Sequence, residues 1–286
     1  RERGSVVAGT LARSGLFDLS PRFEPRARGY TVVHFACNVG PLAPGAASVL
    51  TVHDLLHRRR LRGRDRLRGA LLERCLRRAG RVVAISGRTA AAVGELVPEL
   101  RGRVEVVPHG LRRRTVPQLP REHVLAFGGV DPRKRVDLAV EAYRAYRASA
   151  PDPLPLVVLA RAGLSAGRRQ ALAGLGARII ADATREEADA LMAGAAALLH
   201  TSAEEGFGLP VLEAAESATP VVLDADAQLA DEVVGPHCHR VEDTGPSAWA
   251  AALRRAIEAG PVPGALDLPG WAEVARRYRQ LYQEVA

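Results

Sequence analysis

Short apolar runs and longer segments of helical periodicity alternate along most of the chain. Runs of β-branched and aliphatic residues come first at residues 31–35, 48–52, 81–85 and 104–107. A second series follows at residues 124–127, 155–160, 178–181, 197–200 and 220–223. Buried parallel strands are continuous apolar runs of this length, and the intervening segments, such as residues 136–148, are long enough for crossover helices. The pattern therefore predicts an α/β protein.

A Pro- and Arg-rich stretch, residues 111–123, interrupts the alternation and predicts a hinge between two domains. We place one domain at residues 1–115 and a second, Rossmann-like domain at residues 116–269. Residues 270–286 form a final helical segment. Its apolar stripe, for which core packing is a better interpretation than stacking on a ligand, consists of Trp271, Val274, Ala275, Tyr278 and Tyr282.

One loop between a strand and a helix has the composition of an anion-binding turn. It reads Glu205-Gly206-Phe207-Gly208-Leu209-Pro210-Val211-Leu212-Glu213. The two glycines allow main-chain N–H groups to approach an anion, and we expect Pro210 at the first helical position. Glu213 is expected in the first helical turn, where a carboxylate can accept both hydroxyls of a ribose. The alternative interpretation is an ordinary loop-to-helix junction with two solvated acids.

This motif resembles the Glu-x7-Glu signature of the retaining glycosyltransferases of family 4. Several further segments fall in the family's order, and the resemblance covers nearly everything after Tyr30. These segments are Val52-His53-Asp54, Val83-Ala84-Ile85-Ser86, Pro108-His109-Gly110, the stretch from Phe127 to Lys134, and Glu232-Val233-Val234-Gly235. The resemblance implies the GT-B architecture, in which two Rossmann-like domains face each other across a cleft. It also implies that residues 270–286 form a final helix that packs back on the N-terminal domain.

The resemblance also implies an activity. A hexose, with mannose as the first candidate, would pass from a nucleotide diphosphate sugar to a hydroxyl acceptor, with retention of configuration and without a metal ion. GDP or UDP is the expected nucleotide, and no separate cofactor is expected. The spacing of Asp224-Ala225-Asp226 could suit a metal ion, but a turn cap after a strand is the better interpretation.

The resemblance assigns roles residue by residue. The candidate catalytic residues are His53, which would face the donor from across the cleft, Lys134, which would bind the diphosphate, and Glu205, which would meet the sugar. The candidate substrate-binding residues are Gly129, Arg133, Lys134, Glu205, Gly206, Phe207, Gly208, Leu209 and Glu213. Structural alternatives remain open: a surface loop for His53 and a solvated turn for Arg133. His109-Gly110 is interpreted as a tight turn without a catalytic role.

Two features at this site are specific to the chain. Lys134 is the only lysine among 40 basic residues, which favours a dedicated role for its compact ammonium group. Gly129 stands where many members of the family have an arginine for the diphosphate, so Arg133 or Arg135 would have to supply the guanidinium group. The expected opening βαβ unit and its glycine-rich loop are not evident in residues 1–29, and we therefore expect a truncated N-terminal domain. A catalytically impaired scaffold remains an alternative.

The net charge of +8 and the pI near 10.2 raise a second alternative, a basic protein that binds membrane or nucleic acid. The densest basic cluster, residues 58–68, precedes helical spacing of apolar residues and could contact anionic lipid or a lipid-linked acceptor. With only 4% aromatic residues and no nucleic-acid-binding motif, the sequence does not indicate a nucleic-acid partner. The acceptor is expected to be a glycan or lipid-linked hydroxyl.

Cysteines and hydropathy indicate the compartment. Cys37, Cys75 and Cys238 are odd in number and lack the spacing of a metal site or a disulfide framework. No apolar run approaches the ~20 residues needed to span a bilayer, and no signal-peptide pattern opens the sequence. We therefore expect a cytoplasmic protein, with peripheral contact at the inner face of the membrane as an option.

Overall fold

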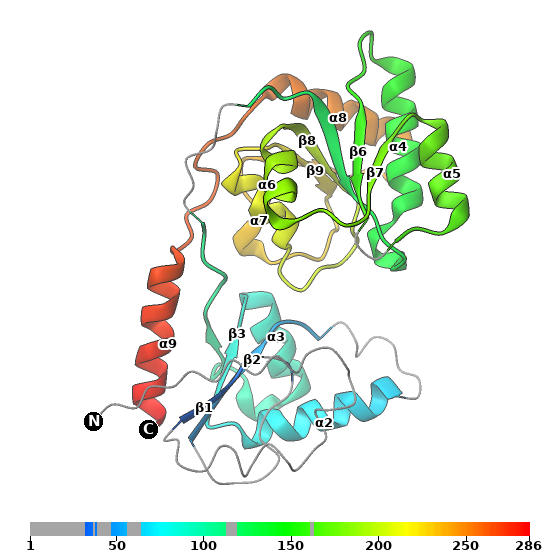
Figure 1. Cartoon of the computed structure of the whole chain (residues 1–286). Helices are drawn as coiled ribbons and strands as arrows, with labels where there is room; N and C mark the ends of the chain where they lie inside the picture. The colour runs from blue at the N-terminus through cyan, green and yellow to red at the C-terminus, as the bar shows by residue number, and fades with distance from the viewer. Residues whose placement is uncertain (1–31, 37, 39–46, 56–63, 113–118, 161–162) are drawn as a thin grey trace.

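A computed structural model of the chain describes residues 32–36, 38, 47–55, 64–112, 119–160 and 163–286 (Figure 1). The expectation of a truncated N-terminal domain falls on residues outside these ranges, as do Cys37, residues 58–63 of the basic cluster and the proposed domain boundary at residue 115. None of the described helices is long and apolar enough to cross a membrane.

The first unit contains a small parallel sheet. Its strands are β1 (Val32–Phe35), β2 (Ala47–Val52), β3 (Arg81–Ala84) and β4 (Glu105–Val106), in the spatial order β1-β2-β3-β4. The associated helices are α2 (Arg64–Arg78), α3 (Gly87–Leu96) and the short η4 (Pro98–Leu100). Leu50 of β2, Leu76 of α2 and Val93 of α3 meet in one buried cluster, so these helices cover one face of the sheet.

The second unit contains six parallel strands in the order β10-β9-β8-β5-β6-β7. The strands are β5 (His123–Phe127), β6 (Leu156–Leu159), β7 (Arg178–Ile180), β8 (Ala195–His200), β9 (Val221–Asp224) and β10 (Cys238–Val241). The connecting elements are η5 (Pro132–Lys134), α4 (Val136–Ser149), α5 (Ala166–Gly174), α6 (Arg185–Ala193), α7 (Leu209–Glu216), η6 (Asp231–Val233) and α8 (Pro246–Ala259). This is the doubly wound order of a Rossmann fold, and it reverses between β5 and β8.

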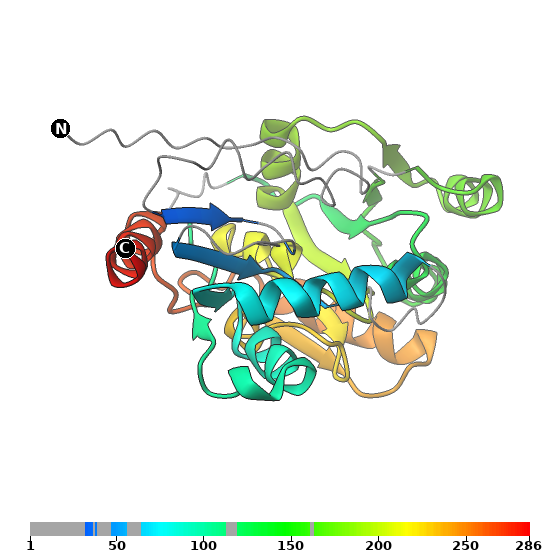
Figure 2. The ribbon, with the colours of Figure 1, turned by 90° about the horizontal axis from the view of Figure 1, so that it is seen from below.

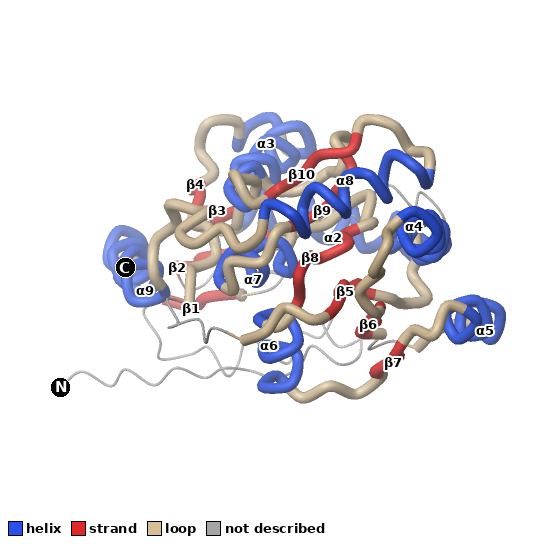
Figure 3. Tube along the Cα trace, turned by 90° about the horizontal axis from the view of Figure 1, so that it is seen from above, coloured by secondary structure: helices blue, strands red, loops and turns tan. Residues whose placement is uncertain are grey.

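Side chains of the second sheet alternate between two cores. In β8, Leu199 packs in the cluster that contains the apolar faces of α4 and α8, whereas Leu198 packs in the cluster that contains α7. Figure 3 shows helices on both sides of the strands. A parallel sheet covered on both faces requires apolar residues at consecutive positions, which explains the uninterrupted apolar runs of its strands.

The predicted strands and helices agree with the structure to within one or two residues at most ends. The strand β10 was not predicted as a separate element. Its sequence, Cys238-His239-Arg240-Val241, carries polar residues because β10 lies at the edge of the sheet and is only partly buried. An edge strand lacks the continuous apolar pattern by which the central strands were recognised.

The C-terminal helix α9 (Trp271–Val285) packs against the first unit (Figures 1 and 2). Val274 and Leu281 of α9 share a buried cluster with Val49 and Val83. The Tyr282 hydroxyl lies 2.7 Å from Nδ1 of His34. The expectation of core packing is wrong for Trp271, whose residue surface is 47% exposed, and for Ala275, which is also exposed. Val274, Tyr278 and Tyr282 of the stripe do pack in the cluster against the sheet.

Candidate functional site

Lys134 and Glu205 meet where the strand order of the second sheet reverses. Lys134 ends η5 in the loop after β5, and Glu205 lies in the loop after β8. The Nζ atom of Lys134 is 2.6 Å from Oε1 of Glu205, and the side chains are 22% and 15% exposed. The carboxyl ends of strands on either side of a switch point form the crevice in which α/β proteins bind ligands. The sequence placed these two residues in one site, and the structure brings them into direct contact.

The turn that carries Lys134 is fastened to its neighbours by hydrogen bonds. Asp131 caps η5 by accepting from the amide of Arg133 at 3.0 Å. Arg135 has a left-handed backbone, with φ of 43°, and donates to the carbonyl oxygen of Thr201 and to Asp224, both at 2.7 Å. A left-handed arginine is strained unless its surroundings hold it. Its partly buried ion pair with Asp224 and its hydrogen bond to Thr201 hold it, and they fix Lys134 beside the end of β8.

The carboxyl group of Glu205 is kept ionised by its partners. Burial by itself would raise its pKa, but the charge of Lys134 and hydrogen bonds from Lys134 and Ser202 outweigh burial, and the pKa lies below its ordinary value. The site therefore presents the carboxylate of Glu205 in contact with the side-chain nitrogen of Lys134. This arrangement suits a ligand that has both negative charge and hydroxyl groups.

The glycine-rich loop contacts the first unit so closely at Gly206 that there is no room for a side chain at that position. A Cβ atom added to Gly206 would lie 2.9 Å from the carbonyl oxygen of His53 and 3.0 Å from Cβ of Asp54. Phe207 is buried, and its ring meets that of His109 edge-on with centroids 4.9 Å apart. The ring of Phe207 therefore serves packing between the units, and its amide is the part of the residue that remains for a ligand.

Helix α7 begins at Leu209, after Gly208 in a left-handed conformation with φ of 98°. The expected helix start is therefore wrong by one residue, because the left-handed glycine allows the helix to start earlier. Pro210 is the second residue of α7, and Glu213 lies beyond its first turn. Among the described residues, the amides of residues 206–209 have no hydrogen-bond acceptor. Consecutive unpaired amides at a helix start form a site for an anion.

Glu213 lies in an ionic cluster that sequence reasoning missed. Its Oε1 atom is 2.7 Å from Nη1 of Arg185 at the start of α6 and 3.7 Å from Nη2 of Arg112. Arg112 follows β4 and also contacts Asp189 and Glu216. Nothing in the sequence spacing connects these residues, because they come from α6, α7 and the segment between the units.

His53 lies in the first unit, with its carbonyl oxygen next to Gly206 of the glycine-rich loop. Its Nε2 atom lies 3.1 Å from the carbonyl oxygen of Ala36, and its ring stacks on His109 with centroids 5.9 Å apart. Burial, and secondly the charge of His53, lower the pKa of His109 to about 4. His109 also lies 5.8 Å from the ring of Trp271. It is thus more than the tight turn expected, because it joins His53, Phe207 and Trp271 in one aromatic cluster.

The other predicted residues surround the Lys134 turn. Gly129 accepts a 3.5 Å hydrogen bond at its carbonyl oxygen from Arg168, and a Cβ atom there would be 3.9 Å from Lys134. Arg133 pairs with Asp131 at 3.0 Å and remains partly exposed. The Leu209 side chain is exposed. Both guanidinium groups considered from the sequence have partners: Arg135 donates to Thr201 and Asp224, and Arg133 donates to Asp131 and, at 3.4 Å, to the carbonyl oxygen of Glu204.

His200, at the end of β8, is the second residue that sequence reasoning missed. It is 2% exposed, and its Nε2 atom has no hydrogen-bond partner among the described residues. Burial lowers its pKa to about 4; the charge of Glu205 raises it, and those of Lys134 and Arg135 lower it further. In the sequence, His200 is the last residue of an apolar run. That position at the carboxyl end of a central strand is the one signal that could have marked it.

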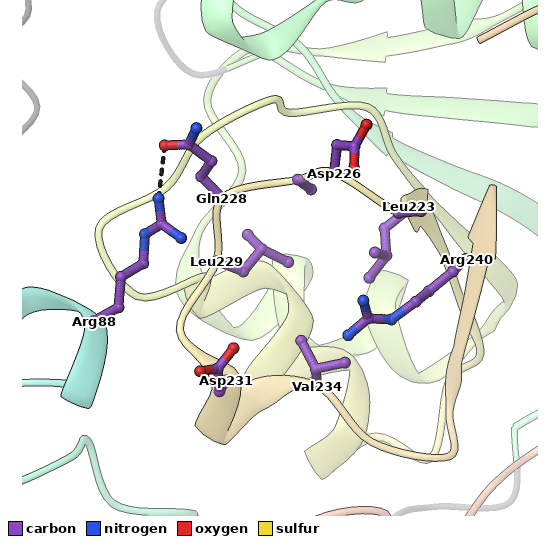
Figure 4. Close-up of a pocket in the computed structure, with 10 residues that line it drawn as sticks. Arg88, Leu223, Asp226, Gln228, Leu229, Asp231, Val234 and Arg240 are labelled. Carbon is purple, nitrogen blue, oxygen red and sulfur yellow. Dashed lines mark hydrogen bonds between the residues drawn. The ribbon is translucent and has the colours of Figure 1, made fainter. Parts of the chain in front are cut away.

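Asp224, the last residue of β9, and Asp226 serve a turn. Asp224 accepts a 2.9 Å hydrogen bond from the amide of Asp226, as the turn-cap interpretation predicted. Beside this turn, residues of α3, of β9, of β10 and of the segment between the two strands line a surface cavity, into which Figure 4 shows Leu229, Val234 and Arg240 pointing. Among the described residues, no three or more His, Cys, Asp or Glu side chains are grouped so that they could hold a metal ion.

Comparison with protein families assigns both units. The family described as Glycosyltransferase Family 4 matches residues 7–113, and the family described as Glycosyl transferases group 1 matches residues 121–259. Together the two matches cover far more than half of the chain. No curated protein matches the sequence significantly.

Solved structures show the same architecture. Sucrose-phosphate synthase from Thermosynechococcus elongatus aligns over 92% of this chain and 76% of its own, with 18% identity and a TM-score of 0.65. WaaG, a glycosyltransferase involved in lipopolysaccharide biosynthesis, aligns over 93% and 80%, with 18% identity and a TM-score of 0.64. AviGT4, a glycosyltransferase involved in avilamycin A biosynthesis, aligns over 90% and 75%, with 21% identity and a TM-score of 0.56. At these identities the likeness concerns the fold.

Two parallel-sheet units and a C-terminal helix that packs back onto the first unit are the architecture of the GT-B glycosyltransferases among the similar solved structures, and the family matches agree with that class. The chain belongs to glycosyltransferase family 4.

Proposed function

We propose that the protein transfers a hexose from a nucleotide diphosphate sugar to a hydroxyl acceptor with retention of configuration. The observation that carries the proposal is the contact of Lys134 with Glu205 at the switch point of the second sheet. GDP and UDP sugars are the proposed donors, with a mannose-like sugar as the first candidate. The proposal includes no metal ion and no cofactor other than the donor.

In this proposal each step uses a group of the candidate site. The bond between the anomeric carbon and the diphosphate breaks, and Lys134, Arg133 and the amides of residues 206–209 stabilise the charge that develops on the leaving group. The acceptor oxygen attacks the face that the diphosphate vacates, so configuration is retained, and the departing phosphate takes the acceptor proton. Glu205 faces the sugar, and His53 approaches it from the first unit. In this proposal Glu213 exchanges Arg185 for the hydroxyls of the ribose.

The acceptor is proposed to be a hydroxyl of a glycan or of a lipid-linked molecule. WaaG, one of the structures with this fold, is described as acting in lipopolysaccharide biosynthesis, which supports an acceptor of that kind. A cytoplasmic protein with peripheral contact to an anionic membrane is consistent with the basic net charge of +8. No nucleic-acid partner is proposed.

A thermal-shift screen of UDP, GDP and ADP sugars tests the proposal. A ligand present at about 100 times its dissociation constant stabilises the folded state by about 2.7 kcal/mol, so the preferred donor should raise the melting temperature more than the others do. Incubation of that donor with candidate acceptors should then yield a glycoside of the same anomeric configuration, detected by nuclear magnetic resonance. Nucleotide binding without any transfer would favour the impaired scaffold, and no stabilisation by any nucleotide sugar would contradict the proposal.

A further inference from the structure

The start of helix α3 is fastened to the second unit by two polar contacts. The amide of Gly87, the first residue of α3, donates to Oε1 of Glu232 at 2.8 Å. The next residue, Arg88, donates from Nη2 to Oε1 of Gln228 at 2.6 Å, as Figure 4 shows. We call the group Gly87, Arg88, Gln228 and Glu232 the α3 latch.

The contact with Glu232 has a clear electrostatic basis. Ser86 caps α3 by accepting from the amide of Thr89 at 3.1 Å, which leaves the amide of Gly87 to find another acceptor. A carboxylate at the positive end of a helix dipole makes a charge-assisted hydrogen bond there. The acceptor comes from the other unit, 145 residues further along the chain. The cap of α3 is therefore completed only while the two units are in contact.

The latch is connected to the loop that carries Glu205. The amide of Glu205 donates to the carbonyl oxygen of Gln228 at 2.9 Å. The amide of Gln228 in turn donates to the carbonyl oxygen of Ala203, also at 2.9 Å. The amide of Ala230 donates to the carbonyl oxygen of Phe207 at 3.2 Å. Gln228 thus holds the Glu205 loop through its backbone and Arg88 through its side chain. Any displacement of residues 228–232 would move Glu205 relative to Lys134.

We propose that the α3 latch is a positioning device for the transfer reaction, in which Arg88 and Glu232 hold the Glu205 loop in its reactive place only when the two units are closed on each other. This inference rests on the proposed glycosyl transfer for its kinetic consequence. Neither Arg88 nor Glu232 contacts the Lys134–Glu205 pair; they act through Gln228 and the loop.

The test compares Glu232→Ala and Arg88→Ala with two exposed controls, Glu258→Ala on α8 and Arg169→Ala on α5. In the full chain, each latch variant should lower kcat by about 10-fold while KM for the donor changes less than about 2-fold, because the lost contacts position the loop and do not bind the nucleotide. Glu232→Gln keeps an acceptor oxygen for Gly87 and should restore most of kcat. The two control variants should have the kcat and the KM of the parent protein.

A second readout does not depend on activity. Hydrogen–deuterium exchange of the peptides that contain Glu205, Gln228 and Ala230 should become faster in Glu232→Ala and Arg88→Ala than in the controls, because these amides depend on the loop pairing. Unchanged exchange in both latch variants overturns the inference, as does faster exchange with an unchanged kcat. If the parent protein transfers no sugar, the proposed function fails, and exchange alone then decides whether the latch holds the loop.

Discussion

At the scale of single residues, the site depends on where two opposite charges meet. Lys134 is the only lysine of the chain, and the other basic residues are arginines. An ammonium group is a compact charge that can follow a leaving phosphate, whereas a guanidinium group binds in a fixed, planar geometry. The pairing with Glu205 at 2.6 Å holds the ammonium at the switch point, from which a diphosphate could draw it away.

Lys134→Ala should reduce kcat strongly and change the affinity for a nucleoside without phosphates very little. The ammonium is proposed to stabilise charge that develops in the transition state, for which removal of one such group costs about 10²- to 10³-fold in rate. Steady-state kinetics and calorimetric binding of the nucleoside would separate the two effects. Lys134→Arg serves as the matched variant that keeps charge but changes geometry. Kinetics of Lys134→Ala equal to those of the parent protein would remove Lys134 from the mechanism.

Glu213→Ala should weaken nucleotide binding by about 30- to 150-fold. This range corresponds to the loss of charge-assisted hydrogen bonds worth roughly 2 to 3 kcal/mol to the ribose. Isothermal titration with the preferred nucleotide measures the change. Glu141→Ala, which removes an exposed carboxylate paired with Arg144 on α4, is the control and should bind as the parent protein does. An unchanged dissociation constant for Glu213→Ala would contradict the ribose role and leave Glu213 as a partner of Arg185 only.

At the scale of elements, the loop between β8 and α7 makes contacts in both units. It presents unpaired amides on one side, packs Phe207 against His109, and pairs with residues 228–230 through its backbone. Gly208 supplies the left-handed conformation at which the loop becomes a helix. Gly206 supplies the close approach to the backbone of His53. The two glycines of the motif are therefore required for different physical reasons.

Gly206→Ala should disturb the contact between the units. Its methyl group would meet the carbonyl oxygen of His53 at 2.9 Å, and backbone atoms cannot move aside as the end of a flexible side chain can. We expect a lower melting temperature and a loss of turnover. Gly167→Ala is the matched control: it lies in α5 with nothing within 4 Å of the added Cβ, and it should stabilise the helix by roughly 0.5–1 kcal/mol. A variant at Gly206 as stable and active as the parent protein would show that the units are not in contact there in solution.

At the scale of the whole molecule, buried neutral histidines tie stability to pH. Burial is the leading cause that lowers the pKa of His34, His109, His200 and His237, each to about 4. In the unfolded chain a histidine has a pKa near 6.5. Between these values the unfolded state binds more protons than the folded state does. The stability that the neutral rings contribute is therefore present above about pH 6.5 and is lost as the pH falls toward 4.

The free energy of unfolding should fall steadily between pH 6.5 and pH 4.5, as measured by urea denaturation at several pH values. His200, which is fully buried, accounts for up to about 3 kcal/mol of the total change down to pH 4. His200→Gln should make the free energy of unfolding depend less steeply on pH. His239→Gln, at a partly exposed position on the edge strand β10, should alter this dependence less. A free energy of unfolding that stays constant over this range would show that the rings are already charged or accessible in the folded protein.

The local pattern of residues was enough to predict the elements and the motif of the chain. Most strands of both sheets were predicted to within a residue or two, because a strand covered on both faces must be apolar at consecutive positions. The adjacency of Lys134 and Glu205 could also be foreseen, since the loops after β5 and β8 meet wherever a doubly wound sheet reverses its order.

The partners of those residues follow from the packing of the two units, which no local pattern records. The contacts of Arg112 and Arg185 with Glu213, of Glu232 with Gly87, and of His109 with Phe207 join segments far apart in the chain. Spacing along a sequence records local periodicity and the residue types that a turn requires. It does not record which surface of the first unit lies against the second unit. That depends on the packing of both sheets and on α9, which packs back onto the first unit.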